Sequence, residues 1–222
     1  MDNMRTIRVT GKGQIKVKPD LTRITLTLEE ICPEYAEALK RSSLQTEHLA
    51  ELLAGFGFDR SDLKTLNFSV DTEYENYKEK GAYKQRLIGY RFHHLMKIEF
   101  DSDNECLGRI LYALANCEIR PEFRLSYTVK YPEAAKNELL GKAVTDAKAK
   151  AAVLSQAAGV SLKDIQSIDY SWGQINFEVE PMNQMLMAKS MADEAGSYDM
   201  DIEPDDIEVS DTVTVIWEIG SK

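Results

Sequence analysis

The feature that most constrains this chain is a strict alternation of apolar and polar residues near its start. From Ile7 to Val17 the odd positions are apolar or glycine, and the even positions are arginine, threonine, lysine or glutamine. A period of two is typical of a β-strand with one buried face. A second alternating run follows the turn at Pro19 and Asp20, with apolar residues at positions 24, 26 and 28. The sequence therefore predicts paired β-strands at the start of the fold.

Two glycines, Gly11 and Gly13, lie on the apolar face of the first strand. One interpretation is a glycine loop that holds phosphate, but such a loop leads directly into a helix, and here another strand follows. A glycine inside a strand often marks the close approach of another element. We therefore predict that a helix or a large aromatic side chain lies over both glycines, and that the lysines of the opposite face are solvated.

The charge balance disfavours several classes of partner. The formal net charge is −10 and the pI is near 4.9, which disfavours nucleic acid and an anionic membrane surface as partners. No apolar run has the roughly 18 residues that a membrane span needs. The first residues lack the apolar core of a signal peptide. We expect a cytoplasmic location for the chain as given, and a periplasmic or secreted one if an export signal was trimmed.

Cysteine usage and motifs give no sign of catalysis. Cys32, Cys106 and Cys117 are odd in number and no two have C-x-x-C spacing, so we expect free thiols and neither disulfides nor a zinc site. No G-x-S-x-G, H-E-x-x-H or phosphate-loop motif is present. The sequence predicts no catalytic residue, no cofactor and no metal site, and hence a protein that is not an enzyme.

Apolar spacing predicts two long helices, at about 33–54 and about 132–158. A capping box, Ser102-x-x-Glu105, predicts the start of a short third helix. A polar hairpin tip is expected at 75–87, and alternating strands fill most of the remaining chain. The second long helix is expected to bury a stripe made of Leu140, Val144, Ala147, Ala151, Leu154 and Ala158.

An internal duplication relates the two halves of the chain. Gly57, Asp62 and Ser69 recur with the same spacing as Gly159, Asp164 and Ser171. We predict a single α+β domain over 1–222, with copies at about 19–100 and 121–219 and a Met-rich acidic insert at about 173–206. Its fold would be an antiparallel sheet with two long helices and one short helix on one face, built from two pseudo-symmetric strand-helix-strand-strand copies.

The order of several short motifs resembles the SIMPL domain family, over about residues 5–219. The motifs are Val9-x-Gly11-x-Gly13 running into Pro19-Asp20, "TLNFSV", Gly89-Tyr90, "DAKAKAAVLSQAAGV" and "IEVSDTVTVIWEI". This largely uncharacterised family includes bacterial periplasmic immunogenic and oxidative-stress-defence proteins. The resemblance implies an α+β fold and self-association, and it carries over no catalytic residue. The chain departs from the family pattern at Pro204-Asp205-Asp206, where relatives often have Pro-Gly, and in lacking an export signal.

One pair of polar residues on apolar strand faces is a candidate site. His94 shares its strand face with apolar residues, and Asp211 shares the inner face of the last strand with Val209, Val213 and Val215. Because the two strands hold equivalent positions in the two copies, a His94–Asp211 pair is one hypothesis. The alternative is an unrelated histidine near a strand end and an aspartate at the sheet margin.

Tyrosines and methionines form the candidate interface. Tyr74, Tyr77, Tyr83 and Tyr90 surround the hairpin, where they could stack a ligand or a partner, or form a cross-strand ladder. Met182, Met185, Met187 and Met191 indicate either a soft-metal or oxidant-sensing cluster or, as the plainer interpretation, a helix packing on the domain or a partner subunit. The acidic residues between 193 and 206 indicate a solvated loop rather than a calcium site.

The sequence therefore predicts a non-enzymatic binding or self-assembling module, forming a homo-oligomer, binding an unidentified protein partner, and acting within a bacterial stress response such as that to oxidative stress. The expected interface residues are Tyr74, Tyr77, Tyr83, Met182, Met185 and Met187. The alternative is a small-molecule-binding protein or enzyme with a pocket between the two copies near His94 and Asp211.

Overall fold

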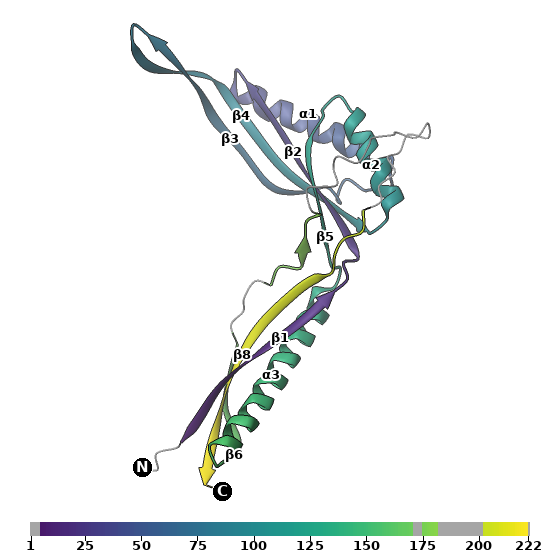
Figure 1. Ribbon diagram of the computed structural model, residues 1–222. Coiled ribbons are helices and arrows are strands. Elements are labelled where there is room, and N and C mark those ends of the chain that lie inside the picture. Colours follow the sequence, from purple (N-terminus) through teal and green to yellow (C-terminus); the bar gives the residue numbers. More distant parts are fainter. Residues whose placement is uncertain (1–4, 171–174, 182–201, 222) are drawn as a thin grey trace. The chain divides into compact units, whose positions relative to one another are not determined.

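A computed structural model describes residues 5–170, 175–181 and 202–221 (Figure 1). The elements, in chain order, are β1 (Thr6–Val17), β2 (Leu21–Cys32), α1 (Tyr35–Ala54), β3 (Lys64–Glu79), β4 (Ala82–Asp101), α2 (Asn104–Asn116), β5 (Glu122–Thr128), α3 (Pro132–Ala157), β6 (Val160–Tyr170), β7 (Glu178–Val179) and β8 (Ile207–Ser221). Within these ranges, three helices and mostly antiparallel strands confirm the α+β class. The strands form two sheets, whereas the sequence analysis expected one.

The chain divides into two compact units, which we describe separately. The first comprises the described residues of 1–19, 128–179 and 205–222, and the second comprises those of 20–127 and 180–204. The predicted boundaries of the two copies therefore differ from those of the units. The pseudo-symmetry of the copies, and their place in one domain, stay predictions.

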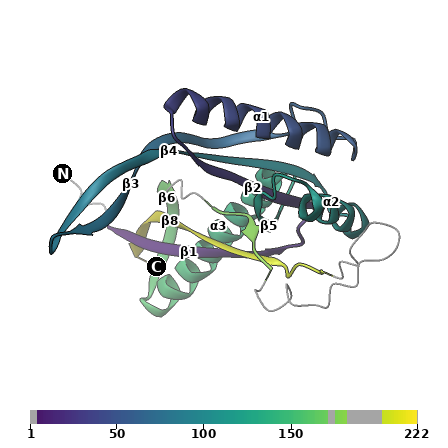
Figure 2. The same cartoon turned by 90° about the horizontal axis from the view of Figure 1, so that it is seen from above.

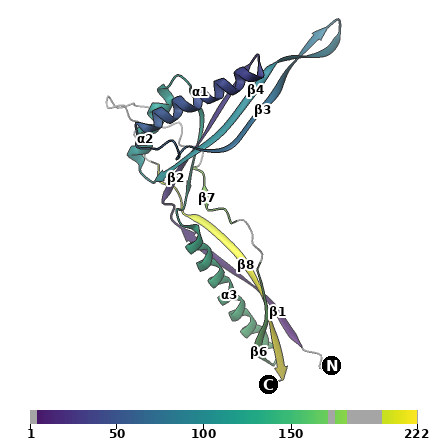
Figure 3. The same ribbon diagram turned by 180° about the vertical axis from the view of Figure 1, so that it is seen from behind.

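The first unit is a three-stranded sheet with the order β1-β8-β6, and α3 packs on it (Figure 3). β1 pairs antiparallel with β8 from Thr6↔Glu218 to Val17↔Ile207, and β8 pairs antiparallel with β6. The alternation predicted from Ile7 to Val17 is confirmed, because Val9, Gly11, Gly13 and Ile15 are buried and the residues between them are exposed. α3 covers one face of β1 and the other face is exposed, which accounts for this pattern.

The two glycines of β1 lie directly under α3, as predicted. A Cβ atom built on Gly11 would collide with the main-chain oxygen of Ala143 and nitrogen of Ala147, and one built on Gly13 would collide with the main-chain oxygen of Leu139. Only glycine allows the backbones of strand and helix to lie this close together. The phosphate-loop interpretation of this stretch therefore has no geometric basis, since residues 6–17 are strand.

The predicted bounds of α3 are confirmed to within one residue, but its predicted buried stripe is correct only at Ala147 and Ala151. The helix buries Ala135, Leu139, Ala143, Ala147, Ala151 and Ser155. Leu140 and Val144 are only partly buried, and Leu154 is half exposed. The reason is the contact with Gly11 and Gly13, because small residues permit it and place the larger side chains on the flank of the helix.

The second unit contains the strands β3-β4-β2-β5, in that order, with α1 packed on β2 and β4 (Figure 2). Ile24, Leu26 and Leu28 of β2 and Phe92, Met96 and Ile98 of β4 are almost completely buried. The opposite face carries half-exposed charged residues, including Arg23, which donates to Glu99 at 2.7 Å. Alternation again separates a covered face from a solvated one.

The start of α2 corrects the predicted capping box. Asp103, not Ser102, is the N-cap, and its carboxylate accepts hydrogen bonds from the main-chain N–H groups of Glu105 and Cys106. The Ser102 hydroxyl instead lies 3.3 Å from that of Thr22 on β2. Serine and aspartate are both good N-cap residues, so residue type alone does not distinguish Ser102 from Asp103. The contact of Ser102 with Thr22 on β2 explains why Asp103 is the cap.

Within the described residues, no helix is both long enough and apolar enough to span a bilayer.

Candidate functional site

The most distinctive surface of the second unit is a two-stranded extension of β3 and β4. Pairing between β2 and β4 ends at Cys32↔Tyr90, and pairing between β3 and β4 continues to Glu79↔Ala82. We call residues Tyr74–Ile88 the hairpin arm, and Figure 1 shows that it extends past the end of α1. The predicted hairpin tip is confirmed, and its turn lies at Lys80 and Gly81, which have φ angles of 49° and 84°.

Ion pairs and cation–π contacts link the two strands of the hairpin arm. Arg86 donates to Glu75 at 2.9 Å, and Lys84 donates to Glu79 at 2.5 Å. The Lys78 ammonium lies 5.8 Å from the centre of the Tyr83 ring, and the Arg86 guanidinium lies 5.7 Å from that of Tyr77. Such cross-strand pairs support a hairpin that has no third strand beside it.

Large apolar side chains on the hairpin arm remain exposed to solvent. The exposed fractions are 81% for Tyr83, 52% for Tyr74, 48% for Leu87 and 41% for Ile88. The sequence analysis selected Tyr74, Tyr77 and Tyr83, and the structure places all three in the arm. It missed Leu87 and Ile88, although an apolar pair after a polar tip was the available signal. Tyr90 lies outside the arm and packs edge-on against Tyr35, with ring centres 5.7 Å apart.

The edge strands of both sheets also expose apolar residues. Leu66 and Phe68 on β3 are about half exposed, as are Ile165, Ile168 and Tyr170 on β6. Among the described strands, β3 and β6 each lie at the end of a sheet, with a described neighbouring strand on one side only. Exposed apolar side chains beside an unpaired edge are typical of surfaces that bind another chain.

His94 lies in a polar cluster beneath α1, which we call the His94 cluster. Its Nδ1 lies 3.1 Å from the Thr46 hydroxyl and 3.4 Å from the Ser42 hydroxyl, and its Nε2 lies 2.9 Å from the Thr65 hydroxyl. The Thr46 hydroxyl proton is donated to the main-chain oxygen of Ser42 at 2.8 Å. Thr46 must therefore accept a hydrogen bond from Nδ1–H, and Nε2 accepts one from Thr65.

Burial keeps the His94 imidazole neutral. The ring is 9% exposed and meets the Phe68 ring edge-on, with centres 5.1 Å apart. Its pKa is lowered from the usual value, first by burial and then by the neighbouring charge of His93. All these contacts hold α1 and β3 to β4, which is a packing role.

Asp211, the other half of the predicted polar pair, lies in the first unit. It is in β8 opposite Gly13, and its Oδ1 accepts a hydrogen bond from the Thr212 N–H at 2.7 Å. His94 belongs to the second unit. The His94–Asp211 pair therefore stays a prediction, while the contacts of His94 that we describe are all with groups in its own unit.

The described thiols have the properties of packed side chains rather than nucleophiles. Cys32 is buried, and Cys106 and Cys117 are half buried, all three as free thiols. Burial raises the pKa of both Cys32 and Cys106, with nearby carboxylates adding to the effect. A raised pKa keeps a thiol protonated at neutral pH and lowers its reactivity.

Other candidate features can be placed only in part. Met182, Met185, Met187, Met191 and the acidic residues up to 201 lie outside the described residues. Among the residues that are described, no three His, Cys, Asp or Glu side chains are grouped as metal ligands. A shallow depression lies on the solvent side of α1, lined by Ala36, Glu37, Lys40, Arg41 and Leu44.

Comparison with known proteins identifies the family. The model of the family described as "SIMPL: Protein of unknown function (DUF541)" matches residues 7–217. The chain belongs to the SIMPL family. The resemblance inferred from the order of motifs is thus confirmed over nearly the whole chain.

The relatives include SIMPL proteins of two bacterial genera. The chain is 26% identical to the "Uncharacterized protein YggE" of Edwardsiella ictaluri over 214 residues, covering 95% of this chain and 85% of that protein. It is 25% identical to the "26 kDa periplasmic immunogenic protein" of Brucella melitensis over 163 residues, covering 73% of this chain and 65% of that protein. The protein of the same name from Brucella abortus matches equally well.

Proposed function

We propose that this SIMPL protein is a non-enzymatic module that associates with other copies of itself. The observation that carries the proposal is the hairpin arm, which exposes Tyr74, Tyr83, Leu87 and Ile88 where neither β2 nor α1 covers it. Exposed apolar and aromatic side chains lose contact with water when a partner binds, and this is favourable by about 25 cal/mol per Å² of apolar surface. Tyrosine is also among the residues enriched at protein interfaces.

The arm is better suited to an interface than to a catalytic role. It is a two-stranded hairpin whose polar groups are largely paired across its strands, and it carries no histidine or cysteine. The half-exposed apolar residues of β3 and β6 supply further surface for association. The burial of His94 and the raised pKa of the Cys32 and Cys106 thiols support the non-enzymatic part of the proposal, because these side chains serve packing.

Light scattering across a wide range of protein concentration tests self-association. We expect the mean mass to exceed that of one chain and to fall on dilution. A mass that stays at that of one chain at high concentration would remove the assembly part of the proposal. A thermal-shift screen against metabolites and metal ions tests the alternative, a small-molecule site near His94 and Asp211, which reproducible stabilisation would favour.

Compartment, pathway and a protein partner are further proposals, the first two supported by the relatives and the third by the exposed surface. Two relatives are named periplasmic proteins, so we propose the periplasm as the compartment if the natural protein carries an export signal, and the cytoplasm otherwise. A role in a stress response follows from the family resemblance, and a protein partner besides a second copy follows from the exposed surface. Fractionation of native cells, peroxide sensitivity of a deletion strain and a pull-down test these three points.

A further inference from the structure

We propose that the tip of the hairpin arm is the cationic side of the contact between copies, and that it docks on the anionic surface of a second copy. This inference deepens the proposed function and rests on it. It assigns the arm a specific electrostatic role and makes association depend on salt, which exposed apolar surface alone would not do.

The formal charge of the tip is opposite to that of the rest of the chain. Residues 75–87 contain four cationic side chains, Lys78, Lys80, Lys84 and Arg86, and two carboxylates, Glu75 and Glu79, for a formal charge of +2. The whole chain carries −10, so the residues outside the tip carry −12. A small cationic extension on an anionic protein is complementary to another copy of the same protein.

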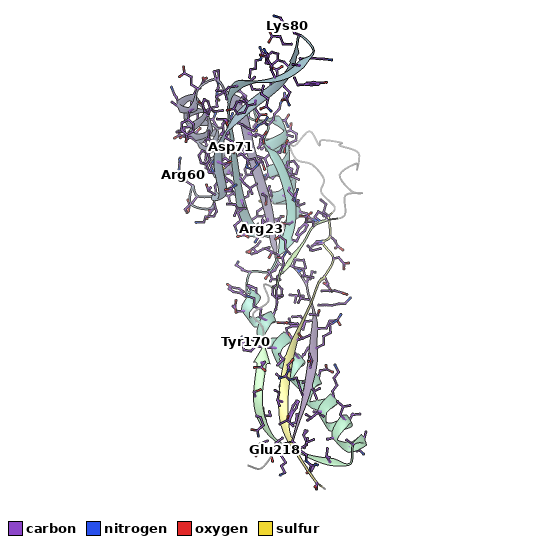
Figure 4. The ribbon with its side chains drawn as sticks, turned by 90° about the vertical axis from the view of Figure 1, so that its left-hand side faces the viewer. Arg23, Arg60, Asp71, Lys80, Tyr170 and Glu218 are labelled. Atoms are coloured by element: carbon purple, nitrogen blue, oxygen red, sulfur yellow. The ribbon has the colours of Figure 1, made fainter. Side chains whose placement is uncertain are left out.

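Two of these cations form no ion pair within the described parts of the chain. Lys84 pairs with Glu79 and Arg86 with Glu75, whereas the Lys78 ammonium lies over the Tyr83 ring and Lys80 lies in the turn. Figure 4 shows Lys80 at the far end of the hairpin. The paired cations also remain accessible, with 53% of the Lys84 side chain and 64% of the Arg86 side chain exposed. The positive charge is therefore presented outward.

The conformation of Lys80 supports a role for its charge. Its φ angle of 49° lies in the left-handed region, where asparagine or glycine would be accommodated more easily than lysine. Gly81 already occupies the next position of the turn with a φ angle of 84°. A lysine in a left-handed conformation at the far end of the arm indicates a requirement for positive charge there.

The composition of the arm favours a protein surface as its target. Tyr83, the most exposed aromatic residue among those described, is flanked by Lys78 and Lys84, which gives an aromatic centre with a charged rim. An anionic membrane would repel the rest of the chain, which carries a net charge of −12, whereas in a second copy that charge attracts the tip. A contact of arm to body is heterologous, because the two copies contribute different surfaces.

The experiment compares the wild-type chain with two double variants by sedimentation velocity. The test variant is Lys78→Glu with Lys80→Glu, which leaves the ion pairs of Lys84 and Arg86 intact. The matched control is Lys40→Glu with Lys148→Glu, on exposed positions of α1 and α3, which makes the same change in net charge. Each protein is measured at about 0.1 M and about 1 M salt, between which the screening length falls from about 10 Å to about 3 Å.

The expected result is that the tip variant weakens self-association about tenfold or more, and the control variant much less. High salt should weaken association of the wild-type protein, and this part of the test needs no variant. Association that is equal in both variants and insensitive to salt would overturn this inference and leave the proposed function standing. A wild-type chain that never associates would overturn both. Flotation of the wild type, but not the tip variant, with phosphatidylglycerol vesicles, in a protein that does not self-associate, would assign the tip to lipid instead.

Discussion

The two long helices pack on their sheets in different ways. In the first unit, α3 lies so close to β1 that its main chain would collide with a Cβ atom at Gly11 or Gly13. In the second unit, hydroxyl groups and an imidazole lie between α1 and the sheet, in the His94 cluster. The first arrangement appears in the sequence as glycines on an apolar strand face. The second appears as a histidine on an apolar face, which resembles a functional site although its observed contacts are those of packing.

The largest effect is expected from filling the contact between β1 and α3. Gly11→Val should destabilise the protein by at least about 3 kcal/mol, because its side chain meets the main chain of Ala143 and Ala147, which cannot move without displacing the helix. Urea unfolding followed by circular dichroism measures this. Gln14→Val, on the exposed face of the same strand, is the control and should change stability by about 0.5 kcal/mol or less. Equal effects of the two substitutions would contradict the close packing.

Truncation of the His94 cluster should have the second largest effect. His94→Ala removes a buried ring, takes away the acceptor of the Thr65 hydroxyl and removes one of the two partners of the Thr46 hydroxyl, at a cost of about 2–4 kcal/mol. His93→Ala, on the opposite face of β4, is the matched control and should cost about 0.5 kcal/mol or less. If the two variants unfold at the same denaturant concentration, the packing role assigned to His94 is wrong.

Replacement of the helix cap tests the start of α2. Asp103→Ala should cost about 1 kcal/mol, because two main-chain N–H groups lose their acceptor. Ser102→Ala should cost less, since its hydroxyl makes only a side-chain contact with Thr22 at 3.3 Å. Thermal unfolding of the two variants shows which substitution lowers stability more. A larger loss of stability for Ser102→Ala would support the capping box predicted from the sequence.

The pH dependence of the unfolding free energy tests the His94 cluster through a smaller expected effect. Because the pKa of His94 is lowered in the folded state, the unfolded state takes up its proton first as the pH falls. The His94 contribution is therefore fully present above the unfolded pKa of about 6.5, and declines below it until the folded pKa is passed. The slope from this one group cannot exceed about 1.4 kcal/mol per pH unit.

Unfolding free energies measured between about pH 7.5 and pH 5 would show this decline. His94→Gln, which keeps a polar side chain but does not titrate, should have a shallower slope than the wild type. Identical slopes for the two proteins would mean that His94 does not titrate differently in the folded and unfolded states.

Local patterns in the sequence predict the helices and strands well. The features that these patterns do not predict depend on long-range contacts. The helix bounds follow from residue spacing, because they depend on neighbours within a few positions. The helix over Gly11 and Gly13 makes a long-range contact, but two glycines on an apolar strand face were enough to predict it. The predicted buried face of α3 was correct at Ala147 and Ala151. Elsewhere the larger Leu140, Val144 and Leu154 were predicted in place of Leu139, Ala143 and Ser155, each one position away. A contact between backbones favours the smaller residues, and spacing alone does not reveal it.

The hairpin arm was also predicted only in part, because the exposure of some of its residues depends on long-range strand pairing. Tyr74, Tyr77 and Tyr83 could be selected because tyrosines around a polar turn are recognisable in the sequence. The exposure of Leu87 and Ile88 depends on where β2 stops pairing with β4, at Cys32 and Tyr90, and this is a property of the sheet. The sequence also carries the charge contrast of the arm, but only the hairpin geometry places its cations together.

The most direct test of the central claim is the mass of an arm variant in solution. Tyr83→Ser combined with Leu87→Ser removes exposed apolar surface without touching the ion pairs of the hairpin, and Val153→Ser on α3 removes an exposed apolar residue from the first unit as a control. At a concentration where the wild type and the control sediment as oligomers, the arm variant should sediment as a single chain, with its unfolding free energy changed by about 0.5 kcal/mol or less. An arm variant that sediments with the same mass as the wild type would contradict the account.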